Sequence, residues 1–150
     1  MGSAEIATVR WGALNSQASL YGTALTLEVS GAVRLANRLM PSGTTIQEWY
    51  SFTRYQSVRD IPALPLLHSG KTYRIEPAIE ASPAGSVIFE VRCFDRFDVL
   101  LRADVLHPPS YAFEYPADCH HYTIRLMNGG CDELRFTSFS LLEVDDRGDR

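Results

Sequence analysis

The chain has no excess of positive charge and no long apolar run. Its 14 Lys and Arg residues stand against 18 Asp and Glu, for a net charge of -4, so it lacks the basic surplus that neutralises a nucleic-acid backbone. No stretch approaches the roughly 18 apolar residues of a membrane-spanning helix, and the N-terminus lacks the apolar core of a signal peptide. We therefore expect a cytoplasmic protein that binds no nucleic acid and does not insert into a membrane.

Cysteine is also scarce, with only Cys93, Cys119 and Cys131. The number is odd, and a chain of 150 residues buries enough surface to fold without disulfide bonds, so we expect reduced thiols. The run Cys119-His120-His121 offers zinc ligands together with Cys131, but the second closely spaced ligand pair of a zinc site is missing. We predict no metal site and no cofactor, and keep zinc as the minor alternative.

Helical periodicity is missing as well. No window of about 12 residues holds apolar side chains at the spacing of one helix face, which argues against strands and helices alternating around a parallel sheet. The composition is 45% apolar and 21% charged, close to ordinary globular proteins, so disorder is not the explanation. The sequence therefore predicts an all-β fold.

Alternation of apolar and polar residues with a period of two is present along most of the chain, and predicts roughly nine or ten strands. Before the last apolar run, the predicted strands cover residues 7–11, 20–29, 33–35, 46–55, 72–80, 87–93, 99–105 and 122–126. In that last run, Leu134 and Phe136 have one parity whereas Phe139 and Leu141 have the other. Such a change of phase requires a β-bulge or a change of sheet, so we predict a long, bent strand.

Many short strands joined by glycine and proline turns hide their edges well in a two-sheet sandwich. We predict a single antiparallel jelly-roll β-sandwich over residues 1–150, and a closed barrel is the alternative. Residues 5–144 should be ordered. Residues 145–150 contain only charged side chains and glycine and should fray.

Catalytic motifs are not found in the sequence. Gly70-Lys71-Thr72 has Pro65 where a phosphate-binding loop has its first glycine, and a predicted strand follows it instead of a helix. No serine lies in a Gly-x-Ser-x-Gly nucleophile elbow. Asp95 and Asp98 form a carboxylate pair of the kind that glycosidases use, but they lie in a predicted hairpin turn, where aspartate commonly caps backbone amides. We predict no catalytic residue and a protein that works by binding.

Aromatic residues are concentrated in the first third of the chain, next to planar polar side chains. Flat rings cover the C–H face of a sugar while amide and guanidinium groups bond its hydroxyls, so this composition allows carbohydrate binding. The sequence leaves open whether Trp11 and Trp49 face a ligand or pack in the core, because large aromatic residues also fill sandwich cores. The candidate ligand-binding residues, for a glycan or a peptide, are Asn37, Trp49, Arg54, Tyr55 and Gln56.

A proline-rich apolar segment lies near the middle of the chain. Pro62 and Pro65 each lack a backbone donor and therefore exclude a central strand, so we predict a rigid crossover pressed onto the sandwich. An exposed segment of this composition would otherwise promote aggregation, which makes it a candidate partner contact as well. The candidate partner-binding residues are Pro62, Leu64, Pro65, Leu66 and Leu67.

Short motifs along the chain resemble those of one protein family. The most specific is Asn37-Arg38-Leu39-Met40-Pro41-Ser42-Gly43, in which turn preference explains only the last three residues. The series runs from about Val9 to Glu143 and resembles the third accessory secretory protein family of the accessory Sec system. Other motifs in it are Tyr21-Gly22-Thr23, Glu48-Trp49, Leu64-Pro65-Leu66-Leu67, Gly70-Lys71-Thr72-Tyr73, Phe94-Asp95-Arg96, Phe113-Glu114-Tyr115-Pro116 and Tyr122-Thr123-Ile124-Arg125-Leu126-Met127-Asn128.

The resemblance implies a fold like that of carbohydrate-binding modules and a non-catalytic role in the intracellular modification and export of serine-rich repeat glycoprotein adhesins. The implied partners are two larger accessory secretory proteins, the accessory SecA motor and the serine-rich repeat glycoprotein cargo, with carbohydrate as a further candidate. The implied location is the cytoplasm, peripheral to the membrane through the export complex. The alternative is a carbohydrate-binding module of a glycan-active enzyme, which would share the architecture and the aromatic residues.

Overall fold

Ten β-strands and no helix are found in the part of the chain that the structure describes. The structure is a computed structural model and describes residues 3–11, 24–27, 32–36, 43–51, 64–108 and 110–144. No helix in these ranges is long and apolar enough to cross a bilayer. The strands are β1 (Ser3–Val9), β2 (Ala24–Leu27), β3 (Val33–Ala36), β4 (Thr45–Tyr50), β5 (Thr72–Ser82), β6 (Val87–Phe94), β7 (Leu100–Leu106), β8 (Ala112–Glu114), β9 (His121–Asn128) and β10 (Glu133–Val144).

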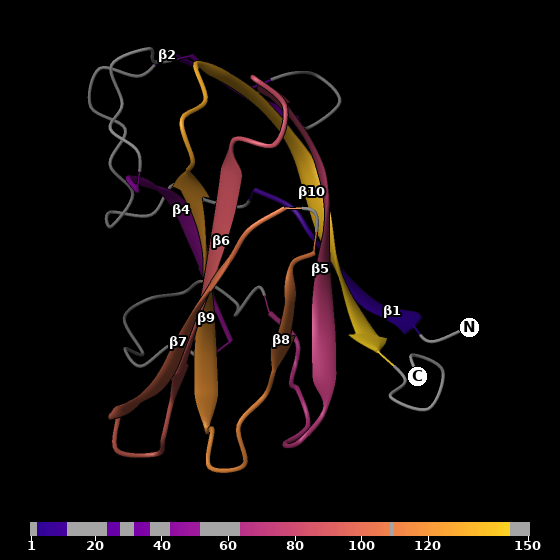
Figure 1. The fold of residues 1–150 in the computed structure, drawn as a ribbon, viewed down its shortest axis with the longest axis vertical. Coiled ribbons are helices and arrows are strands. Elements are labelled where there is room, and N and C mark those ends of the chain that lie inside the picture. Colours follow the sequence, from indigo (N-terminus) through magenta and orange to yellow (C-terminus); the bar gives the residue numbers. More distant parts are fainter. Residues whose placement is uncertain are drawn as a thin grey trace.

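The strands form two antiparallel sheets (Figure 1). The larger sheet has the order β2-β3-β10-β5-β8, with β1 also paired to β10, and the smaller sheet has the order β4-β9-β6-β7. Aromatic contacts join the sheets: Phe89 of β6 meets Phe139 of β10 edge to face, with ring centroids 5.5 Å apart. The predicted all-β sandwich is confirmed, because side chains from both sheets share one buried cluster.

Strand β6 shows why the sequence folds in this way. Its residues alternate strictly, with Val87, Phe89, Val91 and Cys93 buried and the residues between them partly exposed. It pairs with β9 on one side and β7 on the other. Apolar side chains on one parity of a strand bury one face of the sheet and leave the other face to polar groups.

Strand β10 is bent at the position that the sequence predicts. It pairs with β3 from Glu133 to Phe136 and with β1 from Phe139 onward, and its register with β5 shifts between Phe136 and Ser138. The extra residue of the bulge turns both Phe136 and Phe139 toward the core, where both are fully buried. The predicted bulge is confirmed, and it marks the point where β10 changes partners.

Two elements differ from the prediction. The sequence does not predict β8, a three-residue strand in which only Phe113 is buried and which pairs with the first residues of β5. Strand β1 begins at Ser3 instead of residue 7, because its pairing with β10 continues to Val144. On the β8 side, strand pairing of β5 ends at Arg74 and the N–H of Ile75 donates to the carbonyl of Tyr111, so the described edge is open from Glu76 and accommodates the missing N–H of Pro77.

Candidate functional site

Trp49, one of the candidate ligand-binding residues, lies in the core, which decides the alternative that the sequence left open. This side chain is only 3% exposed and lies between the sheets, stacked on Phe136 with ring centroids 5.6 Å apart and edge to face with Phe139 at 4.9 Å. Trp11 is also buried and meets Phe136 edge to face. Both tryptophans are core residues, because both belong to the buried apolar cluster that the two sheets share.

Several predicted residues lie outside the described ranges, namely Asn37, Arg54, Tyr55, Gln56 and Pro62. Their described neighbours are nevertheless placed. Ala36, next to Asn37, pairs with Glu133 just beyond the end of β9 at Asn128, whereas Tyr50 pairs with Thr123 near the start of β9.

The described part of the proline-rich segment lies against the sandwich. The N–H of Leu64 donates to the carbonyl of Tyr50 at 3.2 Å, and the hydroxyl of Tyr122 donates to the carbonyl of Pro65 at 2.6 Å. Leu64 is buried and Leu67 packs partly on the core, but Leu66 is 86% exposed. For residues 64–67 the predicted crossover is confirmed, and one leucine side chain points into solvent.

A row of charged side chains crosses the outer face of the smaller sheet. Arg125 of β9 donates from Nε to Glu48 Oε2 of β4 at 2.7 Å, and its Nη1 lies 3.5 Å from Glu90 Oε1 of β6. The hydroxyl of Tyr50 donates to the other Glu48 oxygen at 2.8 Å. The Glu48 side chain is only 4% exposed and Arg125 is 26% exposed, so this row is a partly buried ion-pair network that joins three strands.

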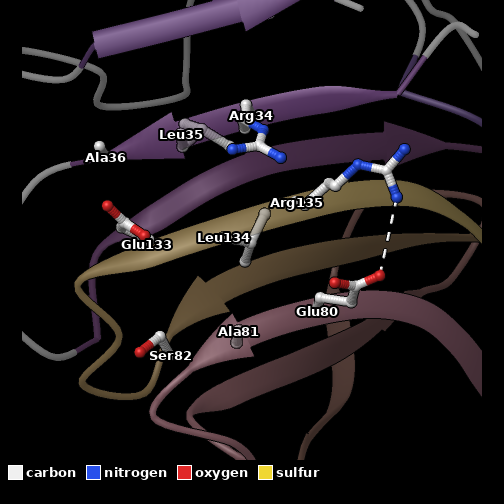
Figure 2. A pocket seen from close by; sticks show the side chains of 9 residues that line it. All are labelled: Arg34, Leu35, Ala36, Glu80, Ala81, Ser82, Glu133, Leu134 and Arg135. Carbon is white, nitrogen blue, oxygen red and sulfur yellow. Dashed lines mark ion pairs between the residues drawn. The ribbon is translucent and has the colours of Figure 1, made fainter.

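A pocket of about 310 Å³ opens on the larger sheet (Figure 2). Its polar lining comes from adjacent strands: Arg34 of β3 is the cross-strand partner of Arg135 of β10, which in turn is the partner of Glu80 of β5. Arg135 Nη1 lies 3.7 Å from Glu80 Oε1. Glu133 and Ser82 form the next row. Two neighbouring guanidinium groups with carboxylates beside them offer donors and acceptors to a ligand rich in hydroxyl groups.

Sequence reasoning missed this pocket, although a signal for it exists. Arg34, Glu80 and Arg135 each occupy the polar parity of a predicted strand. Only the pairing of β3, β10 and β5 brings the three side chains into one row. The ligand-binding prediction instead followed the aromatic residues, and the described tryptophans among them turn inward.

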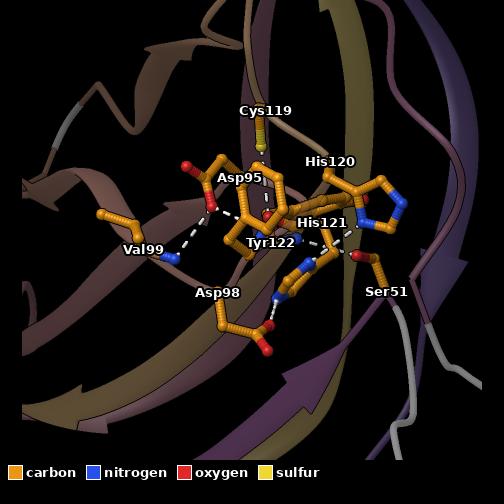
Figure 3. Close-up of polar contacts among 9 residues, drawn as sticks. Ser51, Asp95, Asp98, Val99, Cys119, His120, His121 and Tyr122 are labelled. Atoms are coloured by element: carbon orange, nitrogen blue, oxygen red, sulfur yellow. Dashed lines mark hydrogen bonds and ion pairs between the residues drawn. The ribbon is translucent and has the colours of Figure 1, made fainter.

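The Asp95–Asp98 pair lies in the β6–β7 hairpin, as predicted (Figure 3). One oxygen of Asp95 accepts from the backbone N–H groups of Phe97 and Val99 at 2.8 and 2.9 Å, which confirms the predicted capping role. Asp98 has a left-handed backbone (φ 64°), and its carboxylate lies 3.0 Å from Nε2 of His121. Asp95 thus stabilises the hairpin turn, and Asp98 contacts His121.

An aspartate paired with a histidine is part of a nucleophilic triad only if the other imidazole nitrogen meets a nucleophile. In this chain Nδ1 of His121 lies 3.3 Å from Nδ1 of His120. The ring of His121 is also stacked on Phe94, with centroids 5.2 Å apart. These contacts fix the imidazole between two strands and give it a packing role.

Cys119 lies beside the histidines, where its thiol donates to the carbonyl of His121 at 3.1 Å, but Cys131 does not join it. Cys119 precedes β9 and Cys131 follows it, and the eight residues of this strand span about 25 Å. Within the described residues, no group of three or more His, Cys, Asp or Glu side chains is arranged to hold a metal ion. Cys119 and Cys93 share a side-chain hydrogen bond, which lowers the pKa of the Cys119 thiol to about 7 and, together with burial, raises the pKa of Cys93.

Comparison with known proteins identifies the family. The family model described as the accessory Sec secretory system ASP3 matches residues 18–143. The chain belongs to this family. A member from Staphylococcus aureus, an accessory Sec system protein, is 29% identical over 136 residues, which cover 91% of this chain and 42% of the relative. The chain therefore spans less than half the length of that curated relative.

Solved structures agree with this membership. In a crystal structure of accessory secretory proteins 1, 2 and 3 in Streptococcus pneumoniae, one chain matches with a TM-score of 0.84 and 31% identity, over 93% of this chain and 97% of that chain. A Clostridium thermocellum xylanase with a carbohydrate-binding module, complexed with xylohexaose, matches with a TM-score of 0.50 and 14% identity, over 93% of this chain and 28% of that one. At this identity the second likeness shows the fold alone, and it agrees with the predicted architecture.

Proposed function

We propose that this chain is a non-catalytic subunit of the accessory Sec system that binds two larger accessory secretory proteins. The observation that carries the proposal is the match to one chain in the structure of accessory secretory proteins 1, 2 and 3, because it extends over 97% of that chain. The absence of turnover is supported by the roles of the candidate carboxylates: Asp95 caps a turn and Asp98 pairs with His121.

The segment from Leu64 to Leu67 is the proposed contact with one of these partners. Its backbone is held at two points by Tyr50 and Tyr122, so the exposed side chain of Leu66 is presented from a fixed support. A rigid support lowers the entropy that is lost on binding, and an apolar side chain at the centre of a contact gives a large share of the affinity.

Capture of the two accessory secretory proteins by the tagged chain tests this proposal. We expect both to co-purify, and Leu66→Asp to weaken capture by about tenfold or more, since it places a charge in an apolar contact. Phe97→Asp is the matched control, because Phe97 is 78% exposed on the hairpin and should leave capture unchanged. Failure of the unmodified chain to capture either protein would refute the subunit role, and equal effects of the two variants would refute the Leu66 contact.

The second part of the proposal concerns cargo. We place a hydroxyl-rich cargo, either glycan or the serine-rich polypeptide that carries it, at the pocket formed by Arg34, Arg135 and Glu80. The pocket supplies both donors and acceptors, and Ala36, the residue before Asn37, also lines it. Serine hydroxyls and sugar hydroxyls both donate and accept hydrogen bonds, so the same lining serves either ligand.

Titration with glycosylated and unglycosylated serine-rich repeat peptides tests the cargo site and separates the two ligands. The double variant Arg34→Ala, Arg135→Ala should weaken binding by about tenfold, as expected for the loss of hydrogen bonds to charged groups. Arg74→Ala is the matched control, because Arg74 is an exposed arginine of the same sheet that pairs with Glu76 away from the pocket. Unchanged binding in the double variant would exclude this pocket.

The proposed setting is the cytoplasmic side of the membrane, where the subunit is peripheral and reaches the accessory SecA motor through its complex. Cell fractionation with and without the two larger accessory proteins tests this. The chain should sediment with membranes only when they are present. Membrane association in their absence would contradict the indirect attachment.

A further inference from the structure

Strand β7 is the last strand of the smaller sheet (Figure 1), and five of its seven residues are exposed, whereas Asp104 is half-buried and Leu106 is buried. Among the described strands, only β6 pairs with it. Leu100, Leu101 and Val105 are 43%, 40% and 49% exposed, although all three are large apolar residues. Edge strands of monomers are commonly protected by charged side chains, by proline or by being very short. The seven residues of β7 contain no proline, and its two charged side chains, Arg102 and Asp104, pair with each other. This edge therefore offers backbone groups and apolar side chains to another strand.

The side chains of β7 divide between its two faces by parity. Leu101, Ala103 and Val105 lie on the outer face of the sheet. Arg102 and Asp104 lie on the other face, where Arg102 Nε donates to Asp104 Oδ1 at 3.0 Å. One face is thus entirely apolar, and the other carries one charge of each sign at its centre.

The order of these residues is complementary to its own reverse, because Arg102 and Asp104 lie at equal distances on either side of Ala103. About Ala103, the strand reads Leu-Leu-Arg-Ala-Asp-Val-Leu, so an antiparallel second copy centred on this residue places Arg102 opposite Asp104 and Asp104 opposite Arg102. The same register pairs Leu101 with Val105 on the apolar face. Opposite charges and apolar side chains facing one another are the pairs that stabilise antiparallel strands.

Neighbouring registers that keep the same faces are disfavoured. A shift that centres the pairing on Arg102 places two arginines opposite each other, and a shift that centres it on Asp104 places two aspartates opposite each other. Like charges directly opposite destabilise a strand pair. All three registers are two-fold symmetric, as a contact between identical copies requires, and the charges of β7 favour the one centred on Ala103.

We infer that β7 is a self-association surface that binds the β7 strand of a second copy of this chain, antiparallel and centred on Ala103. The pairing joins two four-stranded sheets into one continuous sheet and covers the apolar side chains of both edges. A seven-residue strand pair forms a small contact, so the dimer is weak and forms at high local concentration.

Analytical ultracentrifugation of the full chain, at concentrations from about 10 to about 500 µM, measures the self-association. Arg102→Asp alone and Asp104→Arg alone each place like charges opposite across the two-fold axis and should weaken the dimer by about tenfold or more. An equimolar mixture of these two variants restores both opposite-charge pairs. It should therefore form a heterodimer, a rescue that no effect within a single chain can produce.

Hydrogen exchange on the unmodified chain supplies a second measurement that does not depend on folding of a variant. Backbone amides of β7 should exchange more slowly as concentration rises, whereas those of Glu76 to Ser82 on the open edge of β5 should not change. A chain that stays monomeric with unchanged β7 exchange would overturn the inference. So would a mixture that fails to dimerise, a dimer insensitive to both variants, or β7 protection that appears only when an accessory secretory protein is added.

Discussion

The indole nitrogen of Trp49 donates to the backbone carbonyl of Arg10 at 2.9 Å. This bond ties β4 of the smaller sheet to the chain that leaves β1 of the larger sheet, and it satisfies the one polar atom of a ring that is otherwise packed among aromatic side chains. Trp49 therefore contributes to stability. Its side chain lies in the core and not on the surface, where a ligand would bind.

Trp49→Ala should lower the free energy of unfolding by about 3–5 kcal/mol, since it removes a large buried side chain and leaves a cavity. Trp49→Phe retains an aromatic ring but loses the indole donor, so it should cost less. Urea denaturation followed by circular dichroism measures both. A loss below about 1 kcal/mol for Trp49→Ala would contradict the core position.

Arg125→Met should destabilise the fold by about 1–3 kcal/mol, because it removes the guanidinium that pairs with the buried carboxylate of Glu48 at 2.7 Å. Glu48→Gln in the same background should recover part of the loss, since it removes the buried charge that Arg125 had balanced. A double-mutant cycle on thermal or urea unfolding measures the coupling between the two residues. If the losses of unfolding free energy from the two substitutions simply added, Arg125 and Glu48 would not be energetically coupled.

Asp95→Ala should cost about 0.5–2 kcal/mol, because the carboxylate caps two backbone amides of the hairpin. Asp98→Asn is the companion variant, since asparagine tolerates the left-handed backbone and can still hydrogen-bond His121. It should cost less than Asp98→Ala. Equal losses for Asn and Ala at this position would show that neither backbone preference nor the contact with His121 matters.

The Cys119 thiol should react with iodoacetamide with an apparent pKa of about 7, because the hydrogen bond with Cys93 stabilises its thiolate. Cys93→Ala removes that hydrogen bond and should move the apparent pKa of Cys119 back toward 9.0. Mass spectrometry across pH 6 to about 10 identifies which thiol is modified. Modification of Cys93 in preference to Cys119 would contradict the assignment, since Cys93 is fully buried.

The same pKa shift predicts a pH dependence of stability. The folded pKa of Cys119 lies below its unfolded value, so between about pH 7 and 9 the unfolded chain holds a proton that the folded chain has released, and stability rises with pH. Its contribution is complete above the unfolded pKa and disappears as the pH falls through 7. The difference in unfolding free energy between the unmodified chain and Cys119→Ser should therefore grow across this window.

The sequence by itself determines the all-β class and most of the strands. Alternation with a period of two at residues 87–93 and 122–126 buries one face of each strand wherever that strand is placed, because side chains of a strand alternate between its faces. The change of parity between Phe136 and Phe139 required a bulge, and the structure contains it. Short motifs spread along the chain were enough to indicate the family.

Only the tertiary structure decides which of those faces meet and which polar groups become neighbours. Parity shows that Trp49 and Glu48 point in opposite directions, but the position of the second sheet decides that the tryptophan is the one that packs between the sheets. Arg34, Arg135 and Glu80 are far apart in sequence and form one row only through strand order and register. The exposure of β7 likewise follows from its place at the end of a sheet, since pairing between distant strands depends on contacts that local sequence does not encode.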